Sequence, residues 1–535
     1  MLKKIAGMMV VLMLSLSFPF LAGCSQSKDQ AGAGKKAKDE LVVALGSEPS
    51  NGFDPITGWG RYGTPLFQST LLKRDQELKI VNDLATGYTV SDDGLIWTVK
   101  LRDGVKSSDG RPLTAADVAF TYDTASKSGS VVDLNVLKSV EAVDDHTVKF
   151  TLQHPQSTFV NILAKTGIVP KHAYDKDYSQ KPIGSGPYKF VQWDKGQQLI
   201  VEANPQYYGP KPYFKKITFL YLSEEAAFAA AQAGNVDVAA IVPAVGKQAV
   251  PGMRLVAVHS VDNRGIMFPC MKFGDKTKDG LSIGNDVTAD PAIRKAINTA
   301  IDRKALVDGV LNGFGSPAYT VCDNLPWWNP ETVFNDAEQA EAKKILADGG
   351  WKDTDGDGIL KKGNLKARFT LVYPATDQTR QSLAISVADM VKSLGVRIDV
   401  EGKSWDDIKN LKHTNAVLFG WGSHDPLEMY NLYYSKNGGI EYYNAGFYVN
   451  PAVDEYMDKA LAATSEQEAD EYWKKAQWDG KTGLSAKGDA PWAWLVNLKH
   501  LYLVRNNLDI GAPKIEPHGH GWPITDNIEQ WRLKE

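Results

Sequence analysis

The pattern of hydrophobic and polar residues predicts several β-hairpins. Residues 87–101, GYTVSDDGLIWTVKL, form two alternating runs on either side of an Asp-Gly turn, which is typical of a hairpin. Residues 140–155, VEAVDDHTVKFTLQHP, have the same character and predict a second hairpin. In the second run of the first hairpin, three side chains should share a buried face: Trp97, Val99 and Leu101.

Helical patterns alternate with strand patterns in the rest of the chain. Thr114 is the predicted N-cap of a helix, and Asp117, three residues later, makes an imperfect capping box. The apolar spacing of residues 290–313 predicts a pair of amphipathic helices that ends at Gly313. The remaining expected units are a first strand at 41–45, a helix with a glycine stop at 337–351, and strand–helix–strand units at 219–241 and 367–408. This mixture predicts an α/β fold with β-rich insertions.

The N-terminus has the pattern of an export signal. Lys3 and Lys4 precede an apolar run that is too short for a comfortable membrane-spanning helix, which needs about 20 apolar residues. The run ends in Leu-Ala-Gly followed by Cys24, which resembles the bacterial lipobox, where the cysteine is acylated and becomes the new N-terminus. We therefore expect residues 1–23 to be a lipoprotein signal and Cys24 to carry lipid, with a plain secretory signal or an uncleaved anchor as the alternatives.

A flexible tether is expected to follow the lipidated cysteine. Residues 24–40 contain no aromatic or β-branched side chains and cannot bury a core. The protein is therefore expected to be anchored by lipid to the extracytoplasmic face of the cell membrane, in a periplasmic or cell-surface position.

Size and charge narrow the classes of function. About 500 residues remain after the signal, enough for two or three domains. The net charge of −4 becomes −6 when the positive charges of Lys3 and Lys4 leave with the signal, which argues against nucleic acid as a partner. His-Glu-x-x-His and P-loop motifs are absent from the sequence, and Gly184-Ser185-Gly186 lacks the nucleophile elbow, so no enzyme class is indicated.

Two further cysteines leave two alternatives open. Cys270 and Cys322 lie in strand-like contexts on either side of a predicted helix, and in an oxidising compartment they are a candidate disulfide. The alternative is a pair of buried thiols. Neither belongs to a Cys-x-x-Cys motif, so a zinc or redox site is not indicated.

Several sequence blocks in a fixed order resemble a known family. They are GYTVSDDGLIWTVKLRDGVKSSDGRPLTAADVAFTYD, PIGSGPYKF, ANPQYYGPKPYFKKITFLYL, AGNVDVA, DPAIRKAINTAIDRKALVDGVLNGFGSPA and GGWKDTDGDGILKKG. Together these blocks resemble the extracytoplasmic solute-binding proteins of the peptide/nickel class, family 5, which supply ABC importers. The resemblance extends from Leu41 to about Leu508.

The resemblance implies a fold and a mode of action. The expected fold class is α/β, bilobal and periplasmic-binding-protein-like (type II, cluster C), with an extra β-rich subdomain on the N-lobe. The implied boundaries are an N-lobe at 41–261, its β-rich subdomain at about 76–181, a C-lobe at 262–489, and a return crossover with C-terminal tail at 490–535. The two lobes would close about a hinge on a ligand that binds the closed state better. A monomer is expected that needs no cofactor and docks on the transmembrane permease subunits, which work with a cytoplasmic ATPase.

A loop after the first strand is a candidate ligand contact. Residues 52–65, GFDPITGWGRYGTP, contain Trp59, Arg61 and Tyr62, and family members line the cleft with this loop. Arg61 would suit a carboxylate because its guanidinium can form a charge-assisted fork. The alternative is a solvated loop with a packed tryptophan.

A second candidate contact is the stretch 417–448, which follows a strand of the implied C-lobe. Its candidate residues are Trp421, His424, Asp425, Tyr430 and Tyr442. Trp421 could stack on a ligand, Asp425 could take an ammonium group as in dipeptide binders, and His424 could reach a metal. Some nickel binders have a histidine directly after Asp-Pro, where this chain has Leu427, so His424 has a plainer alternative as a structural residue.

Histidines near the C-terminus are further metal candidates. His518 and His520, with His500 upstream, could bind one metal if alternate side chains share a strand face. The alternative is a packed loop in which the adjacent glycines make turns. Taken together, these residues favour a nickel chelate such as nickel–histidine as the ligand, with nickel as part of the cargo, over di- or oligopeptides.

An acidic turn resembles the start of a calcium loop. Asp353, Asp355 and Asp357 have the spacing of an EF-hand, but Asn364 stands where a bidentate glutamate is needed. A simple turn before a strand is the alternative.

Overall fold

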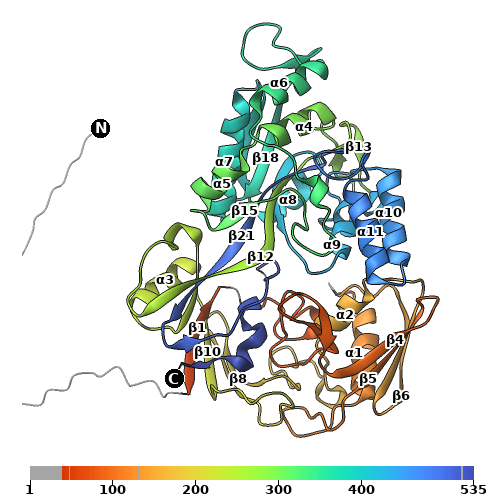
Figure 1. Ribbon diagram of the computed structural model, residues 1–535, viewed down its shortest axis with the longest axis vertical. Coiled ribbons are helices and arrows are strands. Elements are labelled where there is room, and N and C mark those ends of the chain that lie inside the picture. Colours follow the sequence, from red (N-terminus) through yellow and green to blue (C-terminus); the bar gives the residue numbers. More distant parts are fainter. Residues whose placement is uncertain (1–38, 47, 131, 520–521, 535) are drawn as a thin grey trace, which may run out of the picture. The chain divides into compact units, whose positions relative to one another are not determined.

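Two long antiparallel strands, β12 (Met253–Met267) and β21 (Trp492–Arg505), form the middle of an 11-stranded sheet. Strands β20, β18 and β19 continue the sheet on the β12 side, and β11, β1, β10, β9 and β8 continue it on the β21 side, while β15 also pairs with β21. In Figure 1 the two long strands run from the helices around β18 toward β1 and α3. The other strands of the sheet are β1 (Glu40–Leu45), β8 (Tyr188–Asp194), β9 (Gln198–Ala203), β10 (Lys216–Tyr221), β11 (Val238–Ile241), β15 (Gly315–Pro317), β18 (Arg368–Pro374), β19 (Arg397–Lys403) and β20 (Ala416–Trp421).

The computed structural model describes residues 39–535 apart from positions 47, 131, 520, 521 and 535. The predicted signal, Cys24, most of the tether and His520 lie outside the described residues. Within the described part, no helix is both long and apolar enough to cross a membrane. The lobe boundaries implied by the sequence stay a prediction.

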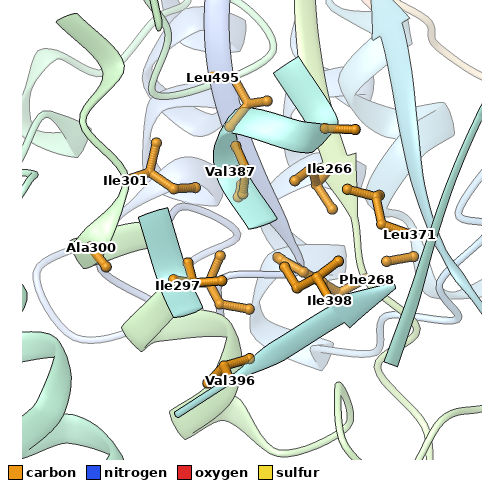
Figure 2. Close-up of a cluster of buried hydrophobic side chains, with 14 of the residues drawn as sticks. Ile266, Phe268, Ile297, Ala300, Ile301, Leu371, Val387, Val396, Ile398 and Leu495 are labelled. Atoms are coloured by element: carbon orange, nitrogen blue, oxygen red, sulfur yellow. The ribbon is translucent and has the colours of Figure 1, made fainter. Parts of the chain in front are cut away.

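Helices cover the β18–β20 portion of the sheet and create a large apolar core. Figure 2 shows Ile266, Leu371 and Ile398 of the sheet pointing toward Ile297 and Val387 of two helices. All five side chains are buried. The helices predicted at 290–313 and 337–351 and the predicted strand–helix–strand unit at 367–408 are confirmed: α4 (Pro291–Ala300), α5 (Arg303–Val310), α6 (Gln339–Asp348) and α7 (Gln378–Lys392), the last between the parallel strands β18 and β19.

The predicted hairpins form a separate four-stranded sheet in the order β4-β5-β7-β6. The alternation predicted for β5 is confirmed, because Trp97, Val99 and Leu101 are buried. At the N-terminus of the covering helix, the backbone N–H of Thr114 donates to the Asp117 carboxylate at 2.8 Å, as the capping box predicts. The elements are β4 (Ala85–Val90), β5 (Ile96–Leu101), β6 (Leu137–Asp144), β7 (Thr147–Leu152), α1 (Ala115–Lys127) and α2 (Phe159–Lys165).

The remaining elements complete the two sides of the main sheet. Helix α3 (Glu224–Gln232) connects β10 to β11, which confirms the strand–helix–strand unit predicted at 219–241. The other helices are α8 (Trp405–Leu411), α9 (Leu427–Tyr433), α10 (Pro451–Ala462) and α11 (Glu466–Gln477). The short strands are β2 (Leu72–Arg74), β3 (Ile80–Asn82), β13 (Asp275–Lys276), β14 (Ser282–Ile283), β16 (Lys361–Lys362), β17 (Leu365–Lys366), β22 (Leu508–Asp509) and β23 (Arg532–Leu533).

Both described cysteines are free thiols, Cys322 buried and Cys270 half-buried, so the candidate disulfide is wrong and the alternative of buried thiols holds fully only for Cys322. The Cys270 thiol donates to the Phe268 carbonyl at 3.3 Å, and the Cys322 thiol donates to the Gln477 side chain at 3.5 Å. The prediction that both cysteines lie in strands is also wrong, because Cys270 follows the end of β12 and Cys322 lies in a turn. Their apolar neighbours reflect burial rather than strand pairing.

Candidate functional site

A small cavity of about 120 Å³ brings together most of the residues that the sequence singled out. Its walls come from the loop before β2, from α2, from the loop after β20 and from α9. We call it the aromatic cavity, after the four aromatic side chains that line it: Trp59, Tyr62, Trp421 and Tyr443. Arg61, Lys165, Asp425 and Glu428 are among its charged lining residues.

The loop that carries Trp59 is held by its own sequence. The Asp54 carboxylate accepts a hydrogen bond from the Ile56 N–H at 2.9 Å, and Gly58 follows with a φ of 108°, which favours glycine. The Trp59 indole N–H donates to the Pro65 carbonyl at 2.7 Å. Trp59 is therefore both a packed tryptophan and a wall of the cavity.

The adjacent Arg61 and Tyr62 lie at the edge of the aromatic cavity. The Arg61 guanidinium lies 4.7 Å from the centre of the Tyr62 ring, in cation–π geometry. Burial raises the pKa of Tyr62, so its hydroxyl stays protonated and can donate. Arg61 is exposed and so keeps its charge available to a ligand carboxylate.

Trp421 is the last residue of β20. Its backbone N–H donates to the Asn263 side chain at 3.2 Å, which fixes the end of the strand. Its indole Nε1 is buried and has no hydrogen-bond partner among the described residues. Buried donors are nearly always paired, so this N–H is suited to an acceptor on a ligand.

Asp425 is 4 % exposed and fully engaged by protein donors. One carboxylate oxygen accepts from Asn161 at 3.2 Å and from the Leu427 N–H at 3.0 Å. The other oxygen accepts from the Lys165 ammonium at 2.9 Å. The ammonium that Asp425 binds in this structure thus belongs to the protein.

Glu428 is an ionisable group of the cavity that the sequence reasoning missed. Burial raises its pKa to about 8, although the backbone N–H groups of Gly422 and Ser423 donate to its two oxygens and oppose the rise. A signal was available, since Glu428 lies in the first turn of α9, two residues after Pro426, where an acidic side chain suits the N-terminal end of a helix.

Tyr430 and Tyr442 do not line the aromatic cavity. Tyr430 stacks on Tyr434 with ring centres 4.3 Å apart, because α9 turns its Glu428 and Asn431 positions toward the cavity instead. The Tyr442 ring packs against Phe419 at 5.9 Å. Its neighbour Tyr443 takes the wall position that the sequence reasoning gave to Tyr442.

His424 lines an adjoining cavity of about 320 Å³, which shares Arg61, Lys165, Ser423 and Asp425 with the aromatic cavity. The Nε2 atom of His424 is buried without a hydrogen-bond partner in the described part of the chain. Burial, together with the nearby charges of Arg74 and Lys514, lowers the pKa of His424 well below its usual range. The imidazole is therefore neutral, as a metal ligand must be, but two cations lie close to it.

His518 belongs to a buried charged cluster formed by the two long strands and the segment after β22, which we call the hinge cluster: Asp262, Arg264, His500, Glu516 and His518. The His518 Nδ1–H and the Arg264 guanidinium both donate to the Asp262 carboxylate. His500 donates to Glu516 at 2.6 Å and to Asp262 at 3.2 Å.

The hinge cluster shifts the protonation of its members. Burial alone would lower the pKa of His500, but its hydrogen bonds to Asp262 and Glu516 raise that pKa to about 10. Burial alone would raise the pKa of Asp262, but the charge of Arg264 and the hydrogen bonds from His500 and His518 hold it well below its usual range. His518 does not line either cavity, although its ring lies 6.3 Å from that of Tyr62, a wall of the aromatic cavity.

The acidic turn at 353–357 brings carboxylate oxygens of Asp353, Asp355 and Asp357 within 4.8 Å of one another on the surface. Lys361 pairs with Asp355 and Asp357, and Lys366 donates to Asp357 at 2.8 Å. The hydrogen bond from Lys366 is the main cause that lowers the pKa of Asp357 to about 2. Because lysines already supply the positive charge, this region fits the turn alternative.

Comparisons with known proteins agree with the expected fold. The model of the bacterial extracellular solute-binding proteins, family 5 Middle, matches residues 79–444. Protein XP55 of Streptomyces lividans is 32% identical over 512 residues, covering 92% of this chain and 90% of that protein. The oligopeptide-binding protein AppA of Bacillus subtilis (strain 168) is 30% identical over 503 residues, covering 87% and 89%.

A solved structure extends the likeness to three dimensions. NikZ from Campylobacter jejuni, in complex with Ni(L-His), superposes with a TM-score of 0.78 at 25% identity, covering 93% of this chain and 100% of that chain. The bilobal α/β fold expected from the sequence is thereby confirmed. The chain belongs to family 5 of the bacterial extracellular solute-binding proteins, which serve ABC importers as substrate-binding components.

Proposed function

We propose that this chain captures a compact nickel chelate, such as a nickel–histidine complex, and delivers it to the permease of an ABC importer. The observation that carries the proposal is the aromatic cavity with Arg61 at its edge. Its volume of about 120 Å³ is below the ~300–1,000 Å³ typical of sites for drug-sized ligands, so it suits a compact solute better than an extended chain.

The chemistry of the cavity matches the parts of such a complex. The aromatic rings of Trp59, Tyr62 and Trp421 provide flat faces for a planar chelate or imidazole. The Arg61 guanidinium supplies a positive charge for the chelator's carboxylate. The unpaired Trp421 Nε1–H adds a donor that a carboxylate oxygen would accept.

Ligand capture would proceed by closure of the walls on the solute. The walls come from segments that are distant in the sequence, and β12 and β21 connect the two portions of the main sheet. A solute that contacts both sides binds the closed state better than the open one, which shifts the population to the closed state. We further propose that a lipid on Cys24 anchors a monomer to the membrane, close to the permease.

A short peptide is the second candidate ligand. The adjoining cavity of about 320 Å³ shares four lining residues with the aromatic cavity, so the two could hold a longer ligand together. The relative AppA is named as an oligopeptide-binding protein.

Calorimetric titration of metal-stripped, tagless protein separates the candidates. We expect nickel with free histidine to bind far more tightly than nickel alone, and a mixed pool of di- to pentapeptides to give no signal. Trp421→Ala should weaken nickel–histidine binding at least tenfold, whereas Tyr430→Phe, outside the cavity, should leave it unchanged. Peptide binding without any response to nickel would refute the nickel assignment.

The proposed anchor and oligomeric state have separate tests. Cys24→Ser should release the protein from the membrane fraction, and light scattering should give the mass of one chain. Membrane association that survives Cys24→Ser would contradict lipid anchoring.

A further inference from the structure

We propose that Lys165 is a specificity-determining residue: its ammonium group occupies the Asp425 carboxylate and excludes solutes that present a free ammonium there. This inference rests on the proposed function, because it defines the chemical form in which an amine-containing cargo is accepted. Asp425 and Lys165 line both the aromatic and the adjoining cavity, so the pair lies where a ligand would be held.

The Asp425 carboxylate has no oxygen left without a protein donor. Lys165, Asn161 and the Leu427 N–H donate to it at distances of 2.9, 3.2 and 3.0 Å. The carboxylate is 4 % exposed, and buried charges are normally paired in this way. A ligand ammonium would therefore have to displace Lys165 or place a second cation on one carboxylate.

The position of Lys165 is set by rigid neighbours. Lys165 is the last residue of α2, where a positive charge suits the C-terminal end of a helix. Phe159, Ile162 and Leu163 of the same helix are buried and hold it in place. The Lys165 side chain is only about one-third exposed, at 34%.

Arg74 orients Asn161, the side-chain amide that donates to Asp425. Its guanidinium donates to the Asn161 side-chain oxygen and, at 2.6 Å, to the His424 carbonyl. Because the Asn161 oxygen is used by Arg74, its NH₂ group is the one that faces Asp425. The arrangement thus gives each Asp425 oxygen at least one donor from the protein.

Other acids at the aromatic cavity are poor substitutes for Asp425. The raised pKa of Glu428, about 8, keeps that carboxyl largely protonated at neutral pH. Asp133 is exposed, and exposed ion pairs contribute little. Within the aromatic cavity a free α-amine therefore lacks a good anionic anchor, whereas an amine coordinated to a metal carries no ammonium and needs none.

Titration with two matched peptides tests the role of Lys165. The probes are trialanine, which has a free ammonium, and N-acetyl-trialanine, which has none. For the wild type we expect no preference for trialanine. Either the dissociation constants of the two peptides differ less than twofold, or neither peptide binds detectably. We expect trialanine to bind to Lys165→Met at least tenfold more tightly than it binds to the wild type. We also expect this variant to bind trialanine at least tenfold more tightly than N-acetyl-trialanine.

Three further variants make the test specific. Lys165→Arg should behave as the wild type because it keeps a cation at Asp425. The double variant Lys165→Met/Asp425→Asn should lose the preference, because the anion is gone. Lys171→Met changes an exposed lysine away from both cavities and should match the wild type.

The inference is overturned if Lys165→Met gains no affinity for trialanine, or if the wild type already prefers trialanine tenfold. Lys165→Gln provides a second neutral variant should the methionine variant fail to fold, which circular dichroism would reveal. Failure of the wild type to bind nickel–histidine would refute the proposed cargo alone, because the trialanine comparison involves no metal.

Discussion

Replacing His500 by glutamine should destabilise the protein strongly at pH 6 and weakly at pH 9. His500 lies on β21 and donates to Glu516 at 2.6 Å and to Asp262, on β12, at 3.2 Å. Glutamine is neutral at every pH, so the variant removes the positive charge that lies between the two carboxylates. The Tyr502 hydroxyl, which donates to Glu516 at 2.9 Å, remains.

The magnitude follows from the shift in the His500 pKa. That pKa is about 10 in the folded protein and 6.5 in an unfolded chain, so the folded state holds the proton more tightly. The stabilisation is fully present below pH 6.5 and is lost as the pH rises toward 10. At ~1.4 kcal/mol per pKa unit, the contribution to the free energy of unfolding is about 4–5 kcal/mol at pH 6 and roughly 1–1.5 kcal/mol at pH 9. Loss of one partner from a buried ion pair typically costs ~3–5 kcal/mol, which agrees with the value at pH 6.

Urea unfolding of both proteins at pH 6 and pH 9 measures this difference. His154→Gln is the matched control, because His154 is exposed and should change stability by less than about 0.5 kcal/mol at either pH. A stability difference between wild type and His500→Gln that is the same at both pH values would refute the reasoning. It would mean that packing, and not the charge of His500, connects the two long strands.

Three other predictions concern the site and the thiols. Arg61→Ala should weaken nickel–histidine binding by roughly 2–5-fold in calorimetry, since an exposed ion pair contributes at most about 1 kcal/mol, while Arg111→Ala should have no effect. Glu428→Gln should gain stability relative to the wild type as the pH rises from 4.5 to 8, by about 2–4 kcal/mol in urea unfolding. The reason is that the wild-type carboxyl ionises in the unfolded chain over this range but is held protonated in the folded protein; parallel stability curves would contradict this. Cys270 and Cys322 should both react with a thiol reagent after unfolding without reductant and hardly at all in the native protein, because burial raises both thiol pKa values; loss of both thiols would indicate a disulfide.

Much of the aromatic cavity was predictable because its residues lie in recognisable stretches. Trp59 and Arg61 come from one loop, and Trp421 and Asp425 follow one strand, so local pattern and the family resemblance identified them. The error between Tyr442 and Tyr443 has a simple cause. Outside regular secondary structure, adjacent side chains point in different directions, and the sequence carries no period from which to choose.

The partners of the charged residues were not predictable in this way. The sequence reasoning made His518 a metal candidate, with a packed loop as the alternative, and could not foresee that the structure pairs it with Asp262, which is 256 positions away. It also left Asp425 open for a ligand, whereas Lys165, 260 positions away, occupies it. Nothing in the local sequence around Lys165 distinguishes it from an ordinary surface lysine at the end of a helix.

The sequence alone determined the elements and the family, because hydrophobic periodicity, turns and caps act over a few neighbouring residues. The hairpin of β4 and β5, the capped helix α1 and the parallel unit β18–α7–β19 all formed where the pattern predicted them. Only the tertiary structure decided which charges meet. Electrostatic energy depends on distance and burial, and both are set by the arrangement of β12, β21 and α2 after the chain has folded. The contact between Lys165 and Asp425 at the aromatic cavity is one such meeting, which no single stretch of sequence contains.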